Sequence, residues 1–194
     1  NEGKYWNSDA GSPFNLAESM SEIATYARVG QDSLEILRDS TGWMAMLFDR
    51  RLPNIGTIDV DKASEGLVWL LSRMPQPDAA PVAGSGFVLR RNLAPLLLGA
   101  GGTKEPKLDG PCGFTSILSP QQVKELSDWL EGIDADQLRL RYDPKAMTTE
   151  SVFPDIWLDD EGAFEDYLMP YFNDLRSFFV EARAKNQYVL VFFT

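Results

Sequence analysis

The segment GAFEDYLMPYFNDLRSFFVEARAK (162–185), followed after two residues by YVLVFF (188–193), decides the fold class. Apolar side chains recur at helical spacing along the first part, so we expect an amphipathic helix. Pro170 interrupts that helix, because proline removes one helical hydrogen bond and clashes with the preceding turn at about 3 kcal/mol. The run 188–193 has the β-branched and aromatic bias of a buried strand. The chain therefore contains a kinked or restarted helix followed by a core strand.

Upstream of this pair, strands and helices alternate without a regular βαβ repeat. Strands are predicted at 23–29 and 114–118. Asp32, Ser119 and Asp134 each precede a predicted helix and are followed three residues later by Glu or Gln, which is the pattern of a capping box. We therefore predict an α+β fold, a single domain in which several helices pack with a small, mostly antiparallel sheet. The residues expected in the core are Leu67, Leu70, Leu126, Trp129, Leu138, Phe172, Leu175, Val189 and Val191.

The chain of 194 residues is long enough for one domain with its own core. Residues 1–19 are rich in Asn, Ser, Asp and Gly and show no periodicity, so we expect an N-terminal extension before a domain at 20–194. No apolar run approaches the roughly 20 residues of a membrane-spanning helix, and no signal peptide is recognised. The single cysteine excludes an intramolecular disulfide and favours a reducing compartment. These features predict a cytoplasmic protein.

The charge balance restricts the partners. With 18 Lys and Arg against 29 Asp and Glu, the formal net charge is −11. Nucleic acid and anionic membrane surfaces attract clustered basic residues, so we expect neither as a partner. A basic protein is compatible with this charge.

The chain contains no histidine, which excludes Ser-His-Asp and Cys-His nucleophiles and histidine-based zinc sites. Cys112 is expected to be a buried, inert thiol, since free cysteine is among the most buried residue types. The glycine-rich run 99–104 fits neither the Walker nor the dinucleotide spacing and is interpreted as a connecting loop. We therefore expect no catalytic residue, no metal site and no cofactor.

Three stretches carry a family resemblance: LSPQQV (118–123), LRLRYDPKAM (138–147) and FPDIW (153–157). In their order they resemble the YfbM-like family, a bacterial domain of unknown function, and the resemblance extends over 20–194. It implies the α+β fold. It implies no activity, because the family has no common activity that can be assigned to individual positions.

The remaining unusual feature is acidic. The stretch 148–175 contains eight carboxylates interleaved with aromatic residues and contains no Lys or Arg. Residues 155–166 have the length of a calcium loop, but Trp157 occupies a ligand position and Asp160 the position of the obligatory glycine. A solvated acidic face over an aromatic core, a carboxylate pair for sugar hydrolysis and a docking surface for a basic protein are the alternatives. The residues predicted to bind a partner are Asp155, Trp157, Asp159, Asp160, Glu161, Glu165 and Asp166.

Because the usual catalytic groups are missing, we expect a non-catalytic protein-binding domain. A toxin-neutralising immunity protein is one such class, and its partner would be a basic protein such as a toxin. The alternatives are a carboxylate-dependent hydrolase and a structural or regulatory interaction module. Trp157 would be either a docking anchor or a core residue, and its place in a family-like stretch favours the core.

Overall fold

The computed structural model describes residues 23–76, 92–110 and 112–194. The predicted extension at 1–19 lies outside these residues, so that boundary stays a prediction. In chain order the elements are β1 (Ala24–Val29), α1 (Gln31–Arg38), α2 (Trp43–Phe48), β2 (Gly56–Asp59), α3 (Ala63–Ser72), the 3-10 helix η2 (Ala94–Leu98), β3 (Thr103–Gly110), β4 (Gly113–Leu118), α4 (Pro120–Glu131), α5 (Ala135–Arg139), α6 (Pro144–Thr149), the π-helical turn η3 (Ala163–Leu168), α7 (Met169–Ala184) and β5 (Tyr188–Phe193). The predicted α+β fold is confirmed.

The five described strands form one sheet in the order β2-β1-β5-β4-β3, and every neighbouring pair is antiparallel. The C-terminal strand β5 lies in the middle, where Val191 is opposite both Tyr26 on β1 and Ser116 on β4. A central strand is covered on both faces, which explains why YVLVFF is a continuous apolar run without polar alternation.

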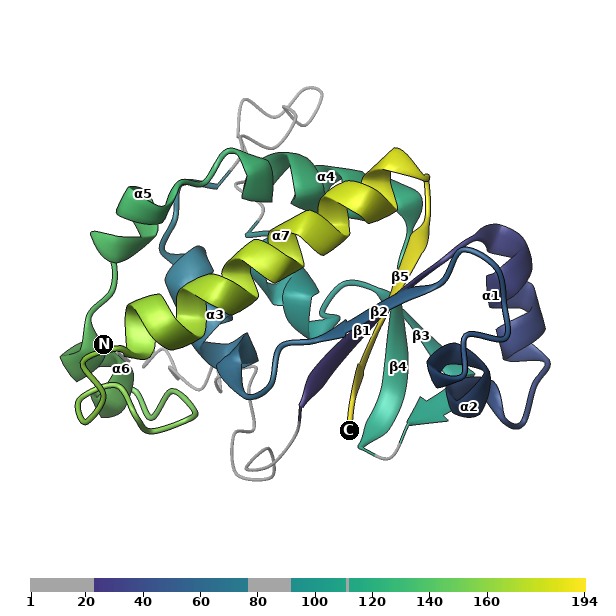
Figure 1. Cartoon of the computed structure of the whole chain (residues 1–194), viewed down its shortest axis with the longest axis horizontal. Helices are drawn as coiled ribbons and strands as arrows, with labels where there is room; N and C mark the ends of the chain where they lie inside the picture. Colours follow the sequence, from purple (N-terminus) through teal and green to yellow (C-terminus); the bar gives the residue numbers. More distant parts are fainter. Residues whose placement is uncertain (1–22, 77–91, 111) are drawn as a thin grey trace, which may run out of the picture.

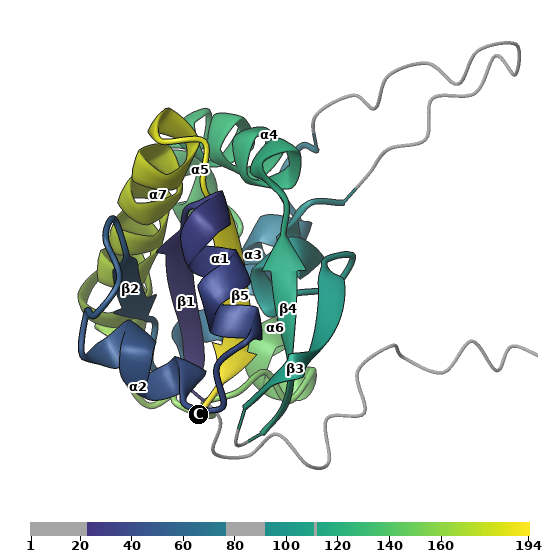
Figure 2. The ribbon, with the colours of Figure 1, turned by 90° about the vertical axis from the view of Figure 1, so that its right-hand side faces the viewer.

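Helices cover both faces of the sheet (Figures 1 and 2). Tyr26 and Val191 point into the larger core, which α3, α4 and α7 complete. Ala27 and Leu190 point the other way, into a smaller core under α1 and α2. Successive strand residues face opposite sides, so each strand serves two cores. All nine residues predicted for the core are buried, which confirms the periodicity on which that prediction rests.

The long C-terminal helical segment divides where the proline predicts. Residues 163–168 form the π-helical turn η3, and α7 begins at Met169 with Pro170 in its first turn. Leu168 and Met169 both have right-handed helical backbone angles, so η3 runs directly into α7. The sequence predicts a kink or a fresh start at Pro170. The structure shows a change from π-helix to α-helix beside Pro170, and the chain does not leave the helix there.

Two of the three predicted capping boxes are present. Ser119 accepts a hydrogen bond from Gln122 N, and Asp134 accepts one from Gln137 N, each with the reciprocal side-chain bond. The prediction that Asp32 caps a helix is wrong. That helix begins at Gln31 after Gly30, and Glu35 instead accepts a hydrogen bond from the Gln31 side chain. The aspartate therefore lies inside the first turn, where its charge still suits the helix dipole.

The sequence interpretation missed β2, β3 and α6. The glycine-rich run 99–104 is interpreted from the sequence as a connecting loop, but β3 starts within it at Thr103. Asp143 caps α6 by accepting a hydrogen bond from Ala146 N, and Pro144 occupies the first helical position. At that position the amide hydrogen that proline lacks would have no helical partner, so proline starts this helix without loss.

Candidate functional site

The predicted acidic segment is a compact turn region between α6 and η3, at the end of the molecule that also carries α5 (Figure 1). Asp155, Asp159, Asp160 and Glu161 are exposed in the turns, and Asp166 is exposed on η3. A main-chain hydrogen bond of 3.0 Å from Asp160 N to Ile156 O closes one turn. The carboxylates therefore lie on an ordered surface.

Trp157 lies under this surface. Its side chain is 2% exposed, and its indole Nε1 donates a 2.6 Å hydrogen bond to Val152 O. The ring packs against Gly66 on α3 so closely that a Cβ added to that glycine would lie 2.6 Å from Trp157 Cη2. Trp157 is therefore a core residue and is removed from the set of residues that can contact a partner.

The acidic residues differ in their own partners. Glu165 forms an ion pair with Arg139, whose guanidinium also lies 4.8 Å from the centroid of the Phe164 ring. Asp160 accepts a 2.8 Å hydrogen bond from Gly162 N. No ion pair to a Lys or Arg of the described chain involves Asp159 or Glu161. The uncompensated charge is thus concentrated at the tip of the turn.

Two exposed leucines lie at the same end of the molecule, and the sequence interpretation missed both. Leu158, next to the buried Trp157, is 53% exposed, and Leu140 after α5 is 84% exposed. Tyr142 joins their segments, because its hydroxyl lies 3.5 Å from Trp157 O and its ring packs 5.1 Å from that of Phe164. The local sequence does not predict that Leu140 and Leu158 are exposed, because their exposure depends on which neighbouring side chains pack into the core.

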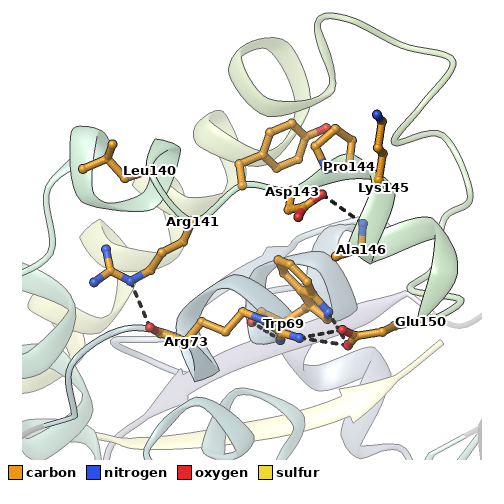
Figure 3. A pocket seen from close by; sticks show the side chains of 10 residues that line it. Trp69, Arg73, Leu140, Arg141, Asp143, Pro144, Lys145, Ala146 and Glu150 are labelled. Carbon is orange, nitrogen blue, oxygen red and sulfur yellow. Dashed lines mark hydrogen bonds and ion pairs between the residues drawn. The ribbon is translucent and has the colours of Figure 1, made fainter.

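An open pocket of about 580 Å³ lies between α3 and the segment that joins α5 to α6 (Figure 3). Seven of its ten lining residues come from the stretch LRLRYDPKAM, so this family-like stretch forms most of the wall. Trp69 on α3 and Arg73, the residue that follows α3, form the opposite wall in Figure 3. The sequence interpretation did not predict this pocket.

A fixed polar cluster forms one side of the pocket. The Arg73 guanidinium lies 3.5 Å from the centroid of the Trp69 ring and donates two hydrogen bonds of 2.9 Å to the Glu150 carboxylate. Trp69 Nε1 donates a further 2.8 Å hydrogen bond to the same carboxylate. These donors stabilise the ionised form, so the Trp69 indole first and Arg73 second hold the pKa of Glu150 below its usual value.

The second arginine of the pocket has no acidic partner in the described chain. Arg141 donates from Nε to Arg73 O and from Nη1 to Gln137 O, both at 2.9 Å. Main-chain carbonyls hold a guanidinium in place but carry no formal charge to neutralise it. Lys145 lies at the rim without an ion-pair partner among the described residues, whereas Asp143 is occupied as the cap of α6.

Cys112 is exposed, so the expectation of a buried thiol is wrong. It lies between β3 and β4, directly before Gly113, the first residue of β4. Within the described residues, no group of three or more Cys, Asp or Glu side chains is arranged to hold a metal ion. No helix in the same residues combines the length and apolar character needed to cross a membrane.

A family model described as "Domain of unknown function (DUF1877)" matches residues 20–192. Among solved structures, the chain is similar to a protein of unknown function, YfbM from Escherichia coli, with 19% sequence identity and a TM-score of 0.58. The similarity covers 89% of this chain and 99% of that one, and at this identity it shows the fold alone. No curated protein matches the chain.

Proposed function

This chain belongs to the DUF1877 family, a domain of unknown function, and from that premise we propose that it is a non-catalytic domain that binds a basic protein. The contact surface is the end formed by Leu140, Leu158 and the acidic turn 155–161. The observation that carries the proposal is Leu158, a large apolar side chain that is 53% exposed and directly followed by Asp159, Asp160 and Glu161.

An exposed leucine beside uncompensated carboxylates suits a protein interface. Interfaces bury an apolar centre and surround it with polar residues, so Leu158 and Leu140 would supply the centre and the carboxylates the rim. Four large apolar side chains of the described chain are exposed, and two of them are at this end. The other two, Ile36 and Phe48, lie on α1 and α2 at the opposite end of the view in Figure 1.

Electrostatics makes a basic partner the natural complement. The net charge of −11 attracts cations at long range, and the exposed acids at the turn orient the encounter. Glu165 contributes less, because Arg139 already neutralises it. An immunity protein that neutralises a basic toxin is the specific form of this role that we propose to test first, and a regulatory interaction module is the broader form.

The hydrolase alternative lacks a supporting observation. A glycosidase needs a carboxyl group whose pKa is raised so that it can donate a proton. In the described part of the chain no Asp or Glu is buried, and the two carboxyls with shifted pKa values, Asp128 and Glu150, are both shifted downward. Binding is therefore the role for which we design the experiment.

A photo-reactive amino acid at position 158, introduced in cells of the source organism, tests the surface directly. The matched control carries the same residue at position 36, which is similarly exposed on α1. We expect position 158 to cross-link one basic protein that position 36 does not capture, and we expect Asp159→Lys, Asp160→Lys and Glu161→Lys together to abolish the adduct. Identical adducts at both positions, or an adduct that survives the charge reversal, would contradict the proposal.

A growth assay tests the more specific proposal that the partner is a toxin. A toxin partner, expressed alone, stops growth of the host cells, and co-expression of this chain restores growth. The charge-reversed variant restores it poorly if the acidic turn forms the interface. A partner that is harmless when expressed alone, yet cross-links at position 158, supports the broader interaction module and removes the immunity role.

A further inference from the structure

The pocket between α3 and the α5–α6 segment differs in charge from the rest of the molecule. Its lining contains three cationic residues, Arg73, Arg141 and Lys145, and two anionic ones, Asp143 and Glu150. Glu150 is paired with Arg73, whereas Asp143 accepts a hydrogen bond from the uncharged amide of Ala146 and keeps its charge. Three cations against two anions leave a formal surplus of one positive charge in the lining, within a chain whose formal net charge is −11.

Arg141 supplies the fixed part of that surplus. Its two hydrogen bonds to main-chain carbonyls position the side chain, while part of the guanidinium fork remains available. Arginine presents a planar fork that matches carboxylate and phosphate groups, and it stays charged throughout the physiological range. Lys145, exposed at the rim on a flexible four-carbon stem, can add a second positive charge from the opposite side of the opening.

The other walls combine apolar and polar groups. The Trp69 ring with Arg73 stacked on it forms one wall, and Pro144 and Ala146 lie across from it (Figure 3). A volume of about 580 Å³ falls within the range of about 300–1,000 Å³ typical of small-molecule sites. Such a site has room for a planar or apolar group in addition to an anionic one.

We propose that this pocket binds a small organic anion, in which a carboxylate or phosphate group is attached to a flat, apolar body. Arg141 pairs with the anionic group, Lys145 adds charge from the rim, and the body lies against the Trp69–Arg73 wall. Leu140 borders both this pocket and the surface proposed to bind a protein. The residues that would recognise the anion, Arg141 and Lys145, are not used in the protein-binding proposal, so each proposal has its own test.

Small molecules of similar shape but different charge show whether the pocket recognises an anionic group or only an apolar ring. Benzoate and phenyl phosphate carry the two anionic groups on one ring, benzamide is the neutral counterpart of benzoate, and inorganic phosphate lacks the ring. We would titrate each into the ¹⁵N-labelled chain and follow the Trp69 indole N–H and the Ala146 amide by NMR. We expect saturable shifts with both aromatic anions and binding of benzamide weaker by about tenfold or more. The tighter anion identifies the natural group.

Substitutions of single residues show which cationic side chains bind the anionic group. Arg141→Gln should weaken benzoate binding by about tenfold and Lys145→Met by about threefold, because each removes one positive charge near the anion. Lys185→Met, which changes the net charge equally but lies just after α7, should leave the affinity unchanged. Since Arg141 also bonds two carbonyls, thermal unfolding of each variant is measured. If Arg141→Gln does not fold, Lys145→Met and the benzamide comparison decide the question.

Three outcomes would overturn the proposal. The first is benzamide binding as tightly as benzoate, which would mean that the pocket does not recognise charge. The second is benzoate affinity unchanged in both Lys145→Met and folded Arg141→Gln. The third is the absence of saturable shifts at Trp69 and Ala146 for either aromatic anion at millimolar concentration.

Discussion

The indole Nε1–H of Trp69 on α3 donates a 2.8 Å hydrogen bond to the carboxylate of Glu150, the residue that follows α6. This bond joins residues that are 81 positions apart in sequence, and the two bonds from Arg73 to the same carboxylate span 77 positions. The relationship closes one side of the pocket. It also makes the stability of the fold depend on the ionisation of one exposed carboxyl group.

Glu150→Gln should lower stability at neutral pH, and this effect should be smaller in acid. The folded-state pKa of Glu150 is below its usual value, so its contribution is fully present above the usual value and disappears as pH falls through the folded value. Urea unfolding at about pH 7 and about pH 3 measures the difference between the two proteins. The difference should be small, because the side chain is half exposed, and should be smaller at the lower pH. An equal difference at both pH values would show that the carboxylate charge is irrelevant.

Trp157→Ala should destabilise the fold by about 3–5 kcal/mol, because it removes a large side chain from the core and leaves a cavity. Leu158→Ala, one residue further on, is the matched control and should change the unfolding free energy by less than about 0.5 kcal/mol. Denaturant titration of both variants checks the prediction. Similar losses for the two residues would contradict the assignment of Leu158 to the surface.

Gly66→Ala should destabilise the fold even though alanine favours helices by about 1 kcal/mol over glycine. The new Cβ would lie 2.6 Å from Trp157 Cη2, and overpacking of a core costs about 1–3 kcal/mol. The clash prevails because the Trp157 ring is enclosed and cannot retreat into solvent.

A second substitution tests whether that contact is the cause. In a Trp157→Phe background the smaller ring removes the closest contact, so Gly66→Ala should destabilise the fold clearly less than it does with Trp157 present. The remaining contact, 3.0 Å from the added Cβ to Leu168 Cδ2, is unchanged. A double-mutant cycle measured by denaturant titration gives the coupling. Strict additivity of the two substitutions would contradict the contact.

Cys112 should react with a thiol reagent in the native protein at a rate close to that of the unfolded chain, because its side chain is exposed. Cys112→Ser should alter the unfolding free energy by less than about 0.5 kcal/mol. Native-state labelling, compared with labelling in denaturant, measures the first effect. Protection of the native thiol would restore the buried assignment that the sequence suggested.

The elements that the sequence predicted are those whose signal is local. The Ser119 and Asp134 capping boxes each lie within four residues, and the interruption of the helical pattern at Pro170 follows from one residue. The strand β3 was missed because its residues are mostly polar and include Pro106, and its identity depends on pairing with β4 across an irregular register. The local pattern of polar and apolar residues does not predict strand pairing of this kind.

The candidate sites show the same limit. The acidic residues could be found by composition, but the exposure of Leu158 beside a buried Trp157 depends on the packing of Trp157 against Gly66. The pocket forms because α3 and the segment that joins α5 to α6 lie side by side in the fold. No pattern in the sequence places Arg73 near Arg141, whose Nε lies 2.9 Å from the Arg73 carbonyl oxygen.

If the acidic turn steers a basic partner, its carboxylates increase the rate of encounter, and the association rate constant measures that effect. Asp159→Lys, Asp160→Lys and Glu161→Lys together are compared by stopped-flow with Asp32→Lys, Glu35→Lys and Asp39→Lys. The latter three change the net charge equally and are also exposed, in and just after α1. The partner is the protein cross-linked at position 158.

We predict that the first triple variant associates about tenfold or more slowly, that the α1 variant slows less, and that the wild-type rate falls steeply as salt rises. Equal slowing by both variants would show that only net charge matters. A rate that neither variant nor salt changes would contradict the claim that this end of the molecule is the docking surface.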